Sequence, residues 1–208
     1  GKENSSMIAL IDYGAGNLHS VQNALCAIGK ASSITSDPLV LQQASAAILP
    51  GVGSFGHAMA CMQKAELVKP VLRFIESGKP FLGICLGLQL LFEESAESPG
   101  IKGLGVLRGK IERLPGDRAL KVPHIGWNSL NIRQKNGIFT KIPEEPYVYF
   151  VHSYYLKAED RGIVSATANY GVEFDAAIQK ENLHAAQFHP EKSGERGLEM
   201  LQNFAAMA

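Results

Sequence analysis

The sequence predicts an α/β fold of three layers, with a central, mostly parallel sheet that is covered by helices on both faces. Two observations predict it. Between residue 7 and about residue 91, short apolar runs alternate with segments of helical spacing, which is typical of a parallel sheet with crossover helices. Beyond that point the strand-like runs follow one another with only turns between them, so antiparallel strands should extend the same sheet.

Buried strands and the helices between them are predicted throughout the first half. The pair Asp37-Pro38 is a helix-start signal, because aspartate caps free amide groups and proline fits the first helical position. Gly29 closes the preceding helical stretch. The expected strands are residues 7–11, a short one around Ile34, 46–49 and 81–84, and the expected helices are 18–28, a stretch from 38 onward, and 56–77.

The second half reads as strands separated by turns, followed by one helix over residues 195–206. The expected strands are residues 106–114, 129–132, 147–151, 163–168, 176–179 and 185–188. This pattern, without a repeat or a linker, is typical of a flavodoxin-like three-layer sandwich, so residues 7–208 are predicted to form one domain. Residues 1–6 are polar and aperiodic, and we interpret them as a cloning remnant.

Composition limits the classes of function. The 208 residues are 46% hydrophobic, and 20 basic side chains balance 20 acidic ones. This balance predicts neither a nucleic-acid partner nor a membrane partner. The three cysteines, Cys26, Cys61 and Cys85, lack paired zinc spacings, which predicts free thiols in a reducing compartment and no metal site. Because the sequence shows no secretory signal and no long apolar span, we expect a cytoplasmic protein.

The most informative motif is Gly-Ile-Cys-Leu-Gly at residues 83–87. It follows a buried-strand pattern and precedes a helix-like stretch over residues 86–92, as in a nucleophile elbow that carries a thiol. Glycines two residues before and after Cys85 leave room for neighbouring backbone at a sharp turn. The turn would also place the sulfur at a helix N-terminus, which favours the thiolate. Free cysteines are often simply buried, so this motif alone leaves a packing role open.

A cysteine nucleophile needs a base, and His189 is the best placed of the six histidines. It follows the strand-like residues 185–188, and Pro190 ends that strand. Glu191, two residues beyond the histidine, can fold back and orient the imidazole. The sequence therefore predicts a Cys-His-Glu arrangement, although spacing alone also permits a structural histidine.

A second glycine cluster, at residues 50–56, formally satisfies the dinucleotide-binding pattern G-x-G-x-x-G. That interpretation requires an acidic residue at the end of the next strand, where this sequence has Cys85. The competing interpretation is an oxyanion loop, whose exposed backbone N–H groups would stabilise a tetrahedral intermediate formed at the neighbouring nucleophile. The position of Cys85 favours the oxyanion loop.

Two further segments carry unusual side chains. Residues 121–128 combine Lys121, a histidine, the only tryptophan, Trp127, and Asn128, which favours a protein interface. Residues 149–155 are dense in aromatic side chains, most of which core packing would explain.

Three motifs, at residues 50–53, 83–89 and 189–191, resemble those of the class I (triad-type) glutamine amidotransferases. The segments 121–128 and 149–154 narrow the resemblance to the glutaminase subunits of imidazole glycerol phosphate synthases, in histidine biosynthesis. The resemblance implies that the cysteine attacks the side-chain amide of glutamine and forms a glutamyl thioester. It also implies that the histidine, oriented by the glutamate, moves the protons that release ammonia and later activate water.

The resemblance further implies a set of binding residues and no cofactor. The oxyanion would be held by the backbone N–H groups of Leu86 and of the glycine loop that contains Val52 and Gly53, and Val52 would first turn its amide inward. The residues expected to touch glutamine are Gly51, Gly53, Gln89, Glu97, Ser153 and Tyr154.

The partner that the resemblance implies is a (β/α)₈-barrel cyclase, a separate chain that forms a heterodimer, uses the ammonia and activates the glutaminase when it holds its nucleotide ligand. The expected interface positions are Asn17, Lys121, Trp127, Asn128, Tyr149 and Lys192. Two alternatives stay open. One is an amidotransferase for another partner, such as one in pyridoxal phosphate synthesis, and the other is a non-catalytic flavodoxin-like interaction module with a structural cysteine.

Overall fold

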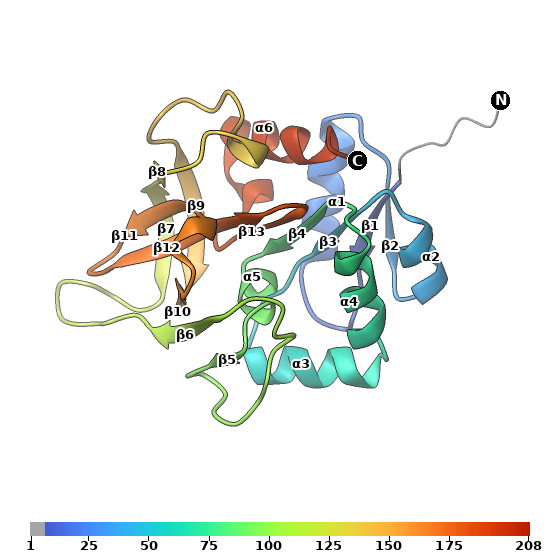
Figure 1. The fold of residues 1–208 in the computed structure, drawn as a ribbon. Coiled ribbons are helices and arrows are strands. Elements are labelled where there is room, and N and C mark those ends of the chain that lie inside the picture. The colour runs from blue at the N-terminus through green and yellow to red at the C-terminus, as the bar shows by residue number, and fades with distance from the viewer. Residues whose placement is uncertain (1–6) are drawn as a thin grey trace.

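The computed structural model describes residues 7–208, so the predicted cloning remnant at residues 1–6 lies outside the described residues. An eleven-stranded mixed sheet forms the central layer of the described chain (Figure 1). In spatial order its main path runs through β2 (Ser32–Thr35), β1 (Ile8–Ile11), β3 (Ala46–Leu49), β4 (Phe81–Ile84), β13 (Leu183–Ala186), β12 (Glu173–Lys180), β10 (Tyr154–Ala158), β6 (Gly109–Arg113) and β5 (Glu94–Ser95). Beside this path, β11 (Val164–Asn169) pairs with β12, and β8 (Asn131–Ile132) pairs with β11.

The first half of the sheet is parallel, as predicted. The strands β1, β3 and β4 are buried along their whole length, which explains their continuous apolar sequences. In the second half, β13 differs from the expected antiparallel addition, because it pairs in parallel with β4. It is also the second arm of an antiparallel hairpin with β12. This placement puts the end of β13, and the histidine that follows it, beside the end of β4.

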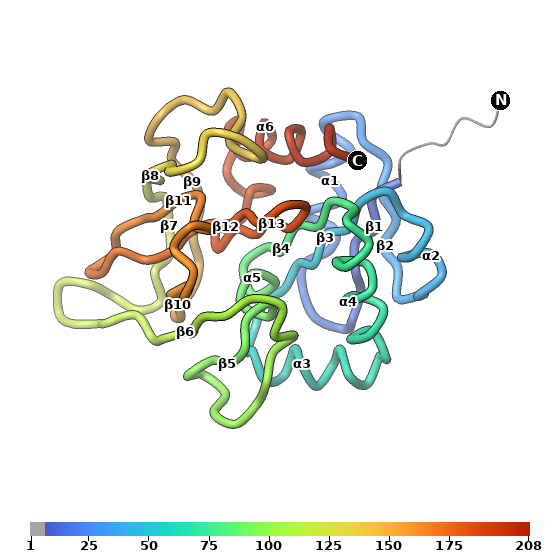
Figure 2. Tube along the Cα trace, viewed as in Figure 1, coloured from blue at the N-terminus to red at the C-terminus, as the bar shows by residue number. Residues whose placement is uncertain are grey.

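Helices cover both faces of the sheet, as Figures 1 and 2 show. One face packs against α1 (Leu18–Ala27) and α6 (Gly194–Ala205). The other face packs against α2 (Pro38–Gln43), α3 (Phe55–Lys64), α4 (Val68–Glu76) and the short α5 (Leu86–Leu90). Within the described part of the chain, no helix is both long and apolar enough to cross a bilayer.

Two local signals in the first half had different outcomes. The predicted cap is present, since the Asp37 carboxylate accepts the Leu39 N–H at 2.9 Å. The helical residues expected from about 56 to 77 are present, but they form two helices, α3 and α4, with Glu66 at φ 57° between them. Pro70 gives the reason: in a continuous helix its ring would clash with the carbonyl four residues earlier, which belongs to Glu66.

A separate two-stranded sheet, β7 (His124–Ser129) and β9 (Tyr147–His152), lies beside the main sheet. The strand expected over residues 147–151 is confirmed, whereas the sequence indicates only a possible interface where β7 lies. Side chains alternate along both strands: Val148 and Phe150 are buried, and Trp127 and Tyr147 are exposed on the opposite face. We call this pair of strands the docking ladder.

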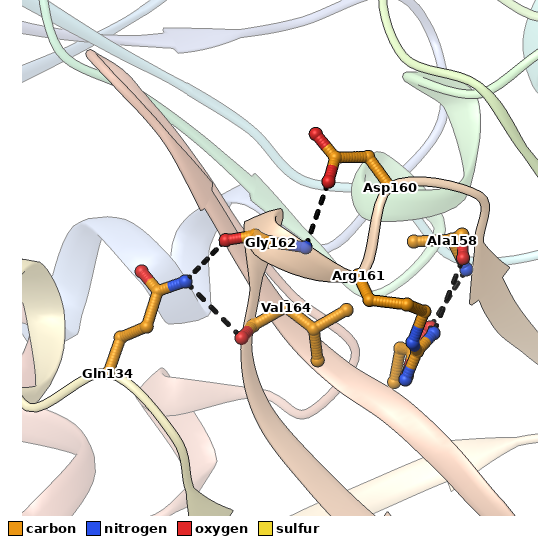
Figure 3. Close-up of polar contacts among 7 residues, drawn as sticks. Gln134, Ala158, Asp160, Arg161, Gly162 and Val164 are labelled. Carbon is orange, nitrogen blue, oxygen red and sulfur yellow. Dashed lines mark hydrogen bonds and ion pairs between the residues drawn. The ribbon is translucent and has the colours of Figure 1, made fainter.

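The remaining turn structures are the 3-10 helices η1 (Gly137–Phe139), η2 (Arg161–Ile163) and η3 (Pro190–Lys192). Figure 3 shows η2, which joins β10 to β11. The Asp160 carboxylate caps its first turn, and the Gln134 side chain donates to the Gly162 carbonyl at 2.7 Å. Arg161 makes a bidentate pair with the buried Asp175 of β12, at 2.6 and 2.7 Å. These contacts fix the outer strands of the sheet relative to one another.

Candidate active site

Cys85 lies on the predicted sharp turn between β4 and α5, with φ 56°. Backbone packing explains the two glycines around it. A Cβ on Gly87 would lie 1.9 Å from the Leu49 carbonyl oxygen, and one on Gly83 would lie 2.8 Å from the Gly87 carbonyl oxygen. Neither position accepts a side chain, so the glycines are required by close approach of the backbone.

The Cys85 sulfur is buried between three strands. The backbone N–H of this residue donates to the Ala186 carbonyl of β13 at 2.7 Å, and its thiol donates to the Val151 carbonyl of β9 at 3.8 Å. The Gln187 amide in turn donates to the sulfur at 3.7 Å. The helix that follows ends at Leu90, which is shorter than the stretch expected over residues 86–92. With so short a helix, we assign the environment of the sulfur mainly to these side-chain and backbone partners.

His189 follows β13 and faces the same site. Its Nδ1 lies 2.5 Å from Glu191 Oε1, and both side chains are almost fully buried. Burial lowers the pKa of the imidazole, but the Cys85 sulfur and the Glu191 carboxylate together outweigh it and raise the pKa to about 10. Among the described residues, His189 Nε2 has no hydrogen-bond partner. The structure therefore brings together all three residues of the predicted triad.

A cavity of about 290 Å³ opens at the sulfur. It is lined by Val52, Gly53, Cys85, Leu86, Gln89, Glu97, Pro123, Val151, His152, Ser153 and Tyr154. All the predicted glutamine-binding residues belong to this lining except Gly51, which lies behind the wall. A Cβ there would lie 2.4 Å from the Tyr13 hydroxyl, so Gly51 serves close packing of the loop. Residues 7–208 contain no group of three or more His, Cys, Asp or Glu side chains that could hold a metal ion.

The predicted oxyanion loop lines the cavity through Val52 and Gly53, and Val52 is 42% exposed. The buried Tyr13 hydroxyl donates to the Pro50 carbonyl at 2.9 Å and holds the start of the loop. The Leu86 N–H, the other predicted oxyanion donor, donates to the Gly51 carbonyl at 3.2 Å. In this conformation that donor is therefore occupied by the loop itself.

The polar side chains of the cavity are held by partners within the protein. Glu97 accepts the Phe55 N–H at the start of α3 with one oxygen, at 2.8 Å. Gln89 donates both amide hydrogens, to the Tyr154 carbonyl at 3.1 Å and to Gln187 Oε1 at 2.9 Å. Only the carbonyl oxygen of the Gln89 side chain is therefore available to a ligand.

Sequence reasoning missed two residues of the site, Gln187 and His152. Gln187 is completely buried and links the sulfur to Gln89. A signal was present, because it is a lone amide in an apolar run, two residues before His189. His152 lines the cavity, but its neighbours in a strand dense in aromatic residues favoured core packing.

Of the predicted interface residues, Trp127 and Tyr149 lie on the outer face of the docking ladder. Trp127 is 55% exposed and pairs with Tyr149 across the strands, with ring centroids 6.2 Å apart. Ile125 and Tyr147, which were not predicted, extend this apolar face. Lys121, Lys192 and Asn17 are exposed. Asn128 is partly buried, and its amide donates to the Asn169 carbonyl at 2.8 Å, so it also serves the fold.

Solved structures share this fold over almost the whole chain. The chain is similar to a structure of PurLQS from Thermotoga maritima, with a TM-score of 0.75, 21% identity and coverage of 96% of this chain and 97% of that one. It is also similar to the glutaminase domain of CTPS from Trypanosoma brucei, with a TM-score of 0.65, 15% identity and coverage of 97% and 94%. At these identities the likeness shows the fold.

Sequence comparisons show the family. A model of the family "Glutamine amidotransferase class-I" matches residues 9–208. The chain is 52% identical over 198 residues to the imidazole glycerol phosphate synthase subunit HisH of Methanothermobacter thermautotrophicus, covering 95% of this chain and 97% of that one. It is 49% identical over 206 residues to the subunit of the same name from Syntrophotalea carbinolica, covering 97% and 100%. The chain therefore belongs to the class I glutamine amidotransferase family, and within it to the HisH subunits of imidazole glycerol phosphate synthase.

Proposed function

We propose that this chain hydrolyses glutamine to glutamate and ammonia, as the glutaminase subunit of an imidazole glycerol phosphate synthase in histidine biosynthesis. One observation carries the proposal: the buried His189 imidazole, bonded at 2.5 Å to Glu191, lies close enough to the Cys85 sulfur, which lines the cavity, for the sulfur to raise the pKa of the ring. Residues 7–208 would act as one domain, and the chemistry uses only side chains and backbone groups of this domain.

In the first half of the proposed reaction, the sulfur attacks the side-chain carbonyl carbon of glutamine after its proton passes to His189. The raised pKa of His189 favours this transfer, because the imidazole then holds the proton at neutral pH. The tetrahedral intermediate collapses as the carbon–nitrogen bond breaks. The imidazolium gives its proton to the leaving nitrogen, so ammonia leaves and a thioester remains on Cys85.

In the second half, water attacks the thioester carbonyl while His189 accepts one of its protons. The carbon–sulfur bond breaks, glutamate leaves, and the proton returns to the sulfur. The sum is glutamine plus water giving glutamate plus ammonia. Glu191 keeps the imidazole in the orientation and tautomer that both steps need.

A turn of one peptide group would form the oxyanion hole. The Gly51 carbonyl, which accepts from Leu86 at 3.2 Å, and the Val52 N–H belong to the same peptide. Rotation of this peptide would release the Leu86 N–H and would turn the Val52 N–H inward in a single movement. Two backbone donors would then face the oxyanion, and each such donor contributes roughly 100- to 1,000-fold in rate.

Glutamine would lie along the cavity with its amide at the sulfur. The Gln89 carbonyl oxygen and the second Glu97 oxygen can accept from its ammonium group. The backbone at Ser153 and Tyr154 also lines the cavity and can bind its carboxylate. The remaining lining is uncharged, as suits a neutral side-chain amide.

We further propose that the outer face of the docking ladder binds a (β/α)₈-barrel cyclase and that the two chains form a heterodimer in the cytoplasm. The exposed aromatic side chains of Trp127 and Tyr147 on one face are typical of a protein interface. The names of the similar proteins, each one part of a synthase, support a second chain. Ammonia released in a docked complex would reach the partner without protonation in bulk water.

The test is Cys85→Ala in the complex with the barrel cyclase, with Cys61→Ala as the matched control. We expect glutamine-dependent synthesis to fall by at least about 10,000-fold, because the nucleophile is lost, while synthesis from added ammonium salts is unchanged. A glutamine-mimicking diazo-ketone should add its mass to the Cys85 peptide only. A folded, partner-bound chain that stays unlabelled would favour the non-catalytic module. A barrel cyclase that neither binds nor raises the glutaminase rate would favour another amidotransferase.

A further inference from the structure

A pair of buried histidines lies on the inner face of the docking ladder and is not used by the mechanism above. His124 of β7 and His152 of β9 are direct partners in the antiparallel register. Their imidazoles approach at 3.0 Å, from His124 Nδ1 to His152 Nε2. Both residues are buried, at 3% and 7% exposure. The same two strands carry Trp127 and Tyr149 on the outer face.

The hydrogen-bond partners fix the tautomer of each ring. His152 Nδ1 lies 2.9 Å from the Tyr154 carbonyl, which can only accept, so Nδ1 carries the hydrogen. In a neutral ring Nε2 is then the acceptor, and His124 Nδ1 must donate to it. His124 Nε2 is left as an acceptor, and the Asn128 amide approaches it at 3.5 Å.

The Asn128 side chain cannot be flipped to favour the opposite tautomers. Its amide nitrogen donates to the Asn169 carbonyl at 2.8 Å, and its oxygen accepts the Ser129 N–H at 2.8 Å. Rotating the amide by 180° would break both bonds. An additional proton on either imidazole would place two donors face to face, and burial lowers the pKa of both rings to about 4.

Packing holds His124 in place as firmly as hydrogen bonding does. Its ring stacks on Tyr170 at 4.0 Å and on Phe150 at 4.9 Å between centroids. His152 contacts Phe174 at 5.0 Å. The pair can therefore act as a rigid connection between the ladder and the residues that follow β9.

Those residues form one wall of the cavity. The hydrogen bond from His152 Nδ1 crosses the bend at Ser153 and reaches the Tyr154 carbonyl, which also accepts a hydrogen bond from Gln89. Gln89 also donates to Gln187, and Gln187 donates to the Cys85 sulfur. A continuous chain of hydrogen bonds thus joins the inner face of the docking ladder to the nucleophile.

We infer that the His124–His152 pair is a positioning element, which sets the glutamine-binding bend at Ser153–Tyr154 from the inner face of the docking ladder. The inference rests on the proposed glutaminase function. Neither histidine touches the reacting atoms, so their loss should weaken glutamine binding more than the chemical steps.

The kinetic test uses the full chain with its barrel partner and compares His152→Leu, His152→Asn and His184→Phe. His152→Leu removes the bond to Tyr154 and should raise KM for glutamine about tenfold, with kcat within about threefold. His152→Asn can donate from nearly the same position and should stay within about threefold of the parent KM. His184 is an equally buried histidine that packs on Phe204, so His184→Phe should lower thermal stability without changing KM.

An unchanged KM in His152→Leu, or an equal rise in His184→Phe, would overturn the inference. Should His152→Leu fail to fold, His124→Phe keeps the ring stacking, removes the hydrogen bonds and should raise KM about threefold or more. Glutamine hydrolysis by the parent complex tests the proposed function separately.

Nitrogen-15 spectra of the free chain test the pair without substrate: both rings should carry hydrogen on Nδ1 and remain neutral down to about pH 5, above the lowered pKa values. Hydrogen on Nε2, or protonation at the ordinary pKa of histidine, would contradict the pair.

Discussion

The two sides of the cavity are held in place by different forces. On the side of β4, steric contact fixes Cys85: the turn is strained at φ 56°, and neither Gly83 nor Gly87 has room for a methyl group. On the side of β9, hydrogen bonds fix the wall. The carbonyl of Tyr149 accepts the His189 N–H at 3.0 Å, and the carbonyl of Val151 accepts the thiol of Cys85.

The two sides should therefore respond differently to a partner chain. A backbone packed at van der Waals distance has one arrangement, whereas a hydrogen-bonded wall can move as a unit as long as none of its buried donors and acceptors is left unpaired. The docking ladder carries the exposed face and the hydrogen-bonded wall on the same two strands. We therefore expect changes on the β4 side to destroy the fold of the site and changes on the β9 side to adjust it.

The largest effect is expected from Gly87→Ala, which introduces a steric clash on the β4 side of the cavity. The new Cβ would overlap the Leu49 carbonyl oxygen, so the free energy of unfolding should fall by about 4 kcal/mol or more. Gly78→Ala is the control without a steric clash: unlike Gly87 it has a positive φ, at 82°, but nothing lies within 4 Å of a Cβ there, so a loss of only about 1 kcal/mol is expected. Urea unfolding measures both. Equal losses would show that close packing does not fix the turn.

A smaller effect is expected from Glu191→Gln, which should leave the fold intact and lower the pKa of His189. Without the carboxylate charge, burial is less opposed and the pKa of His189 should fall from its value of about 10. The imidazole would then hold the proton of Cys85 less well, and kcat for glutamine should fall about 100-fold or more. The titration of His189 followed by NMR should shift to lower pH. Glu195→Gln, on an exposed glutamate nearby, should change neither quantity.

The smallest effect is expected from Trp127→Ala, which alters only the outer face of the docking ladder. Loss of the exposed ring should weaken binding of the barrel cyclase by about 2 kcal/mol, roughly 30-fold in Kd. The stability of the free chain should change by less than about 0.5 kcal/mol. Leu39→Ala, an equally exposed apolar residue on α2, should leave Kd unchanged. Titration calorimetry measures both, and equal Kd values in the two variants would contradict the proposed docking face.

Much of the fold could be predicted, because its signals are local. The strands β3 and β4 match the predicted ranges residue for residue, since each is a short, fully buried apolar run. Asp37-Pro38 marked a helix start that the structure confirms. The break between α3 and α4 was available in principle from Pro70, but helical spacing on both sides concealed it.

Other features depend on which strands become neighbours. The parallel pairing of β13 with β4 joins residues about 100 positions apart, and it alone brings His189 to Cys85. β7 was hidden because its side chains are half polar and its partner, β9, lies beyond a long connection. Gln187 and His152 can be identified as residues of the site only from their hydrogen-bond partners in the folded structure.

The strand cores, and the glycines that the sharp turn at Cys85 requires, could be predicted from the amino-acid sequence alone. These follow from steric rules and periodicities that act within a few residues. Two other features follow from tertiary packing alone: the Leu86 N–H donates to the Gly51 carbonyl, and two histidines connect the docking ladder to the cavity. Such partners lie far apart in the chain, and their distances depend on how the sheet and the ladder pack.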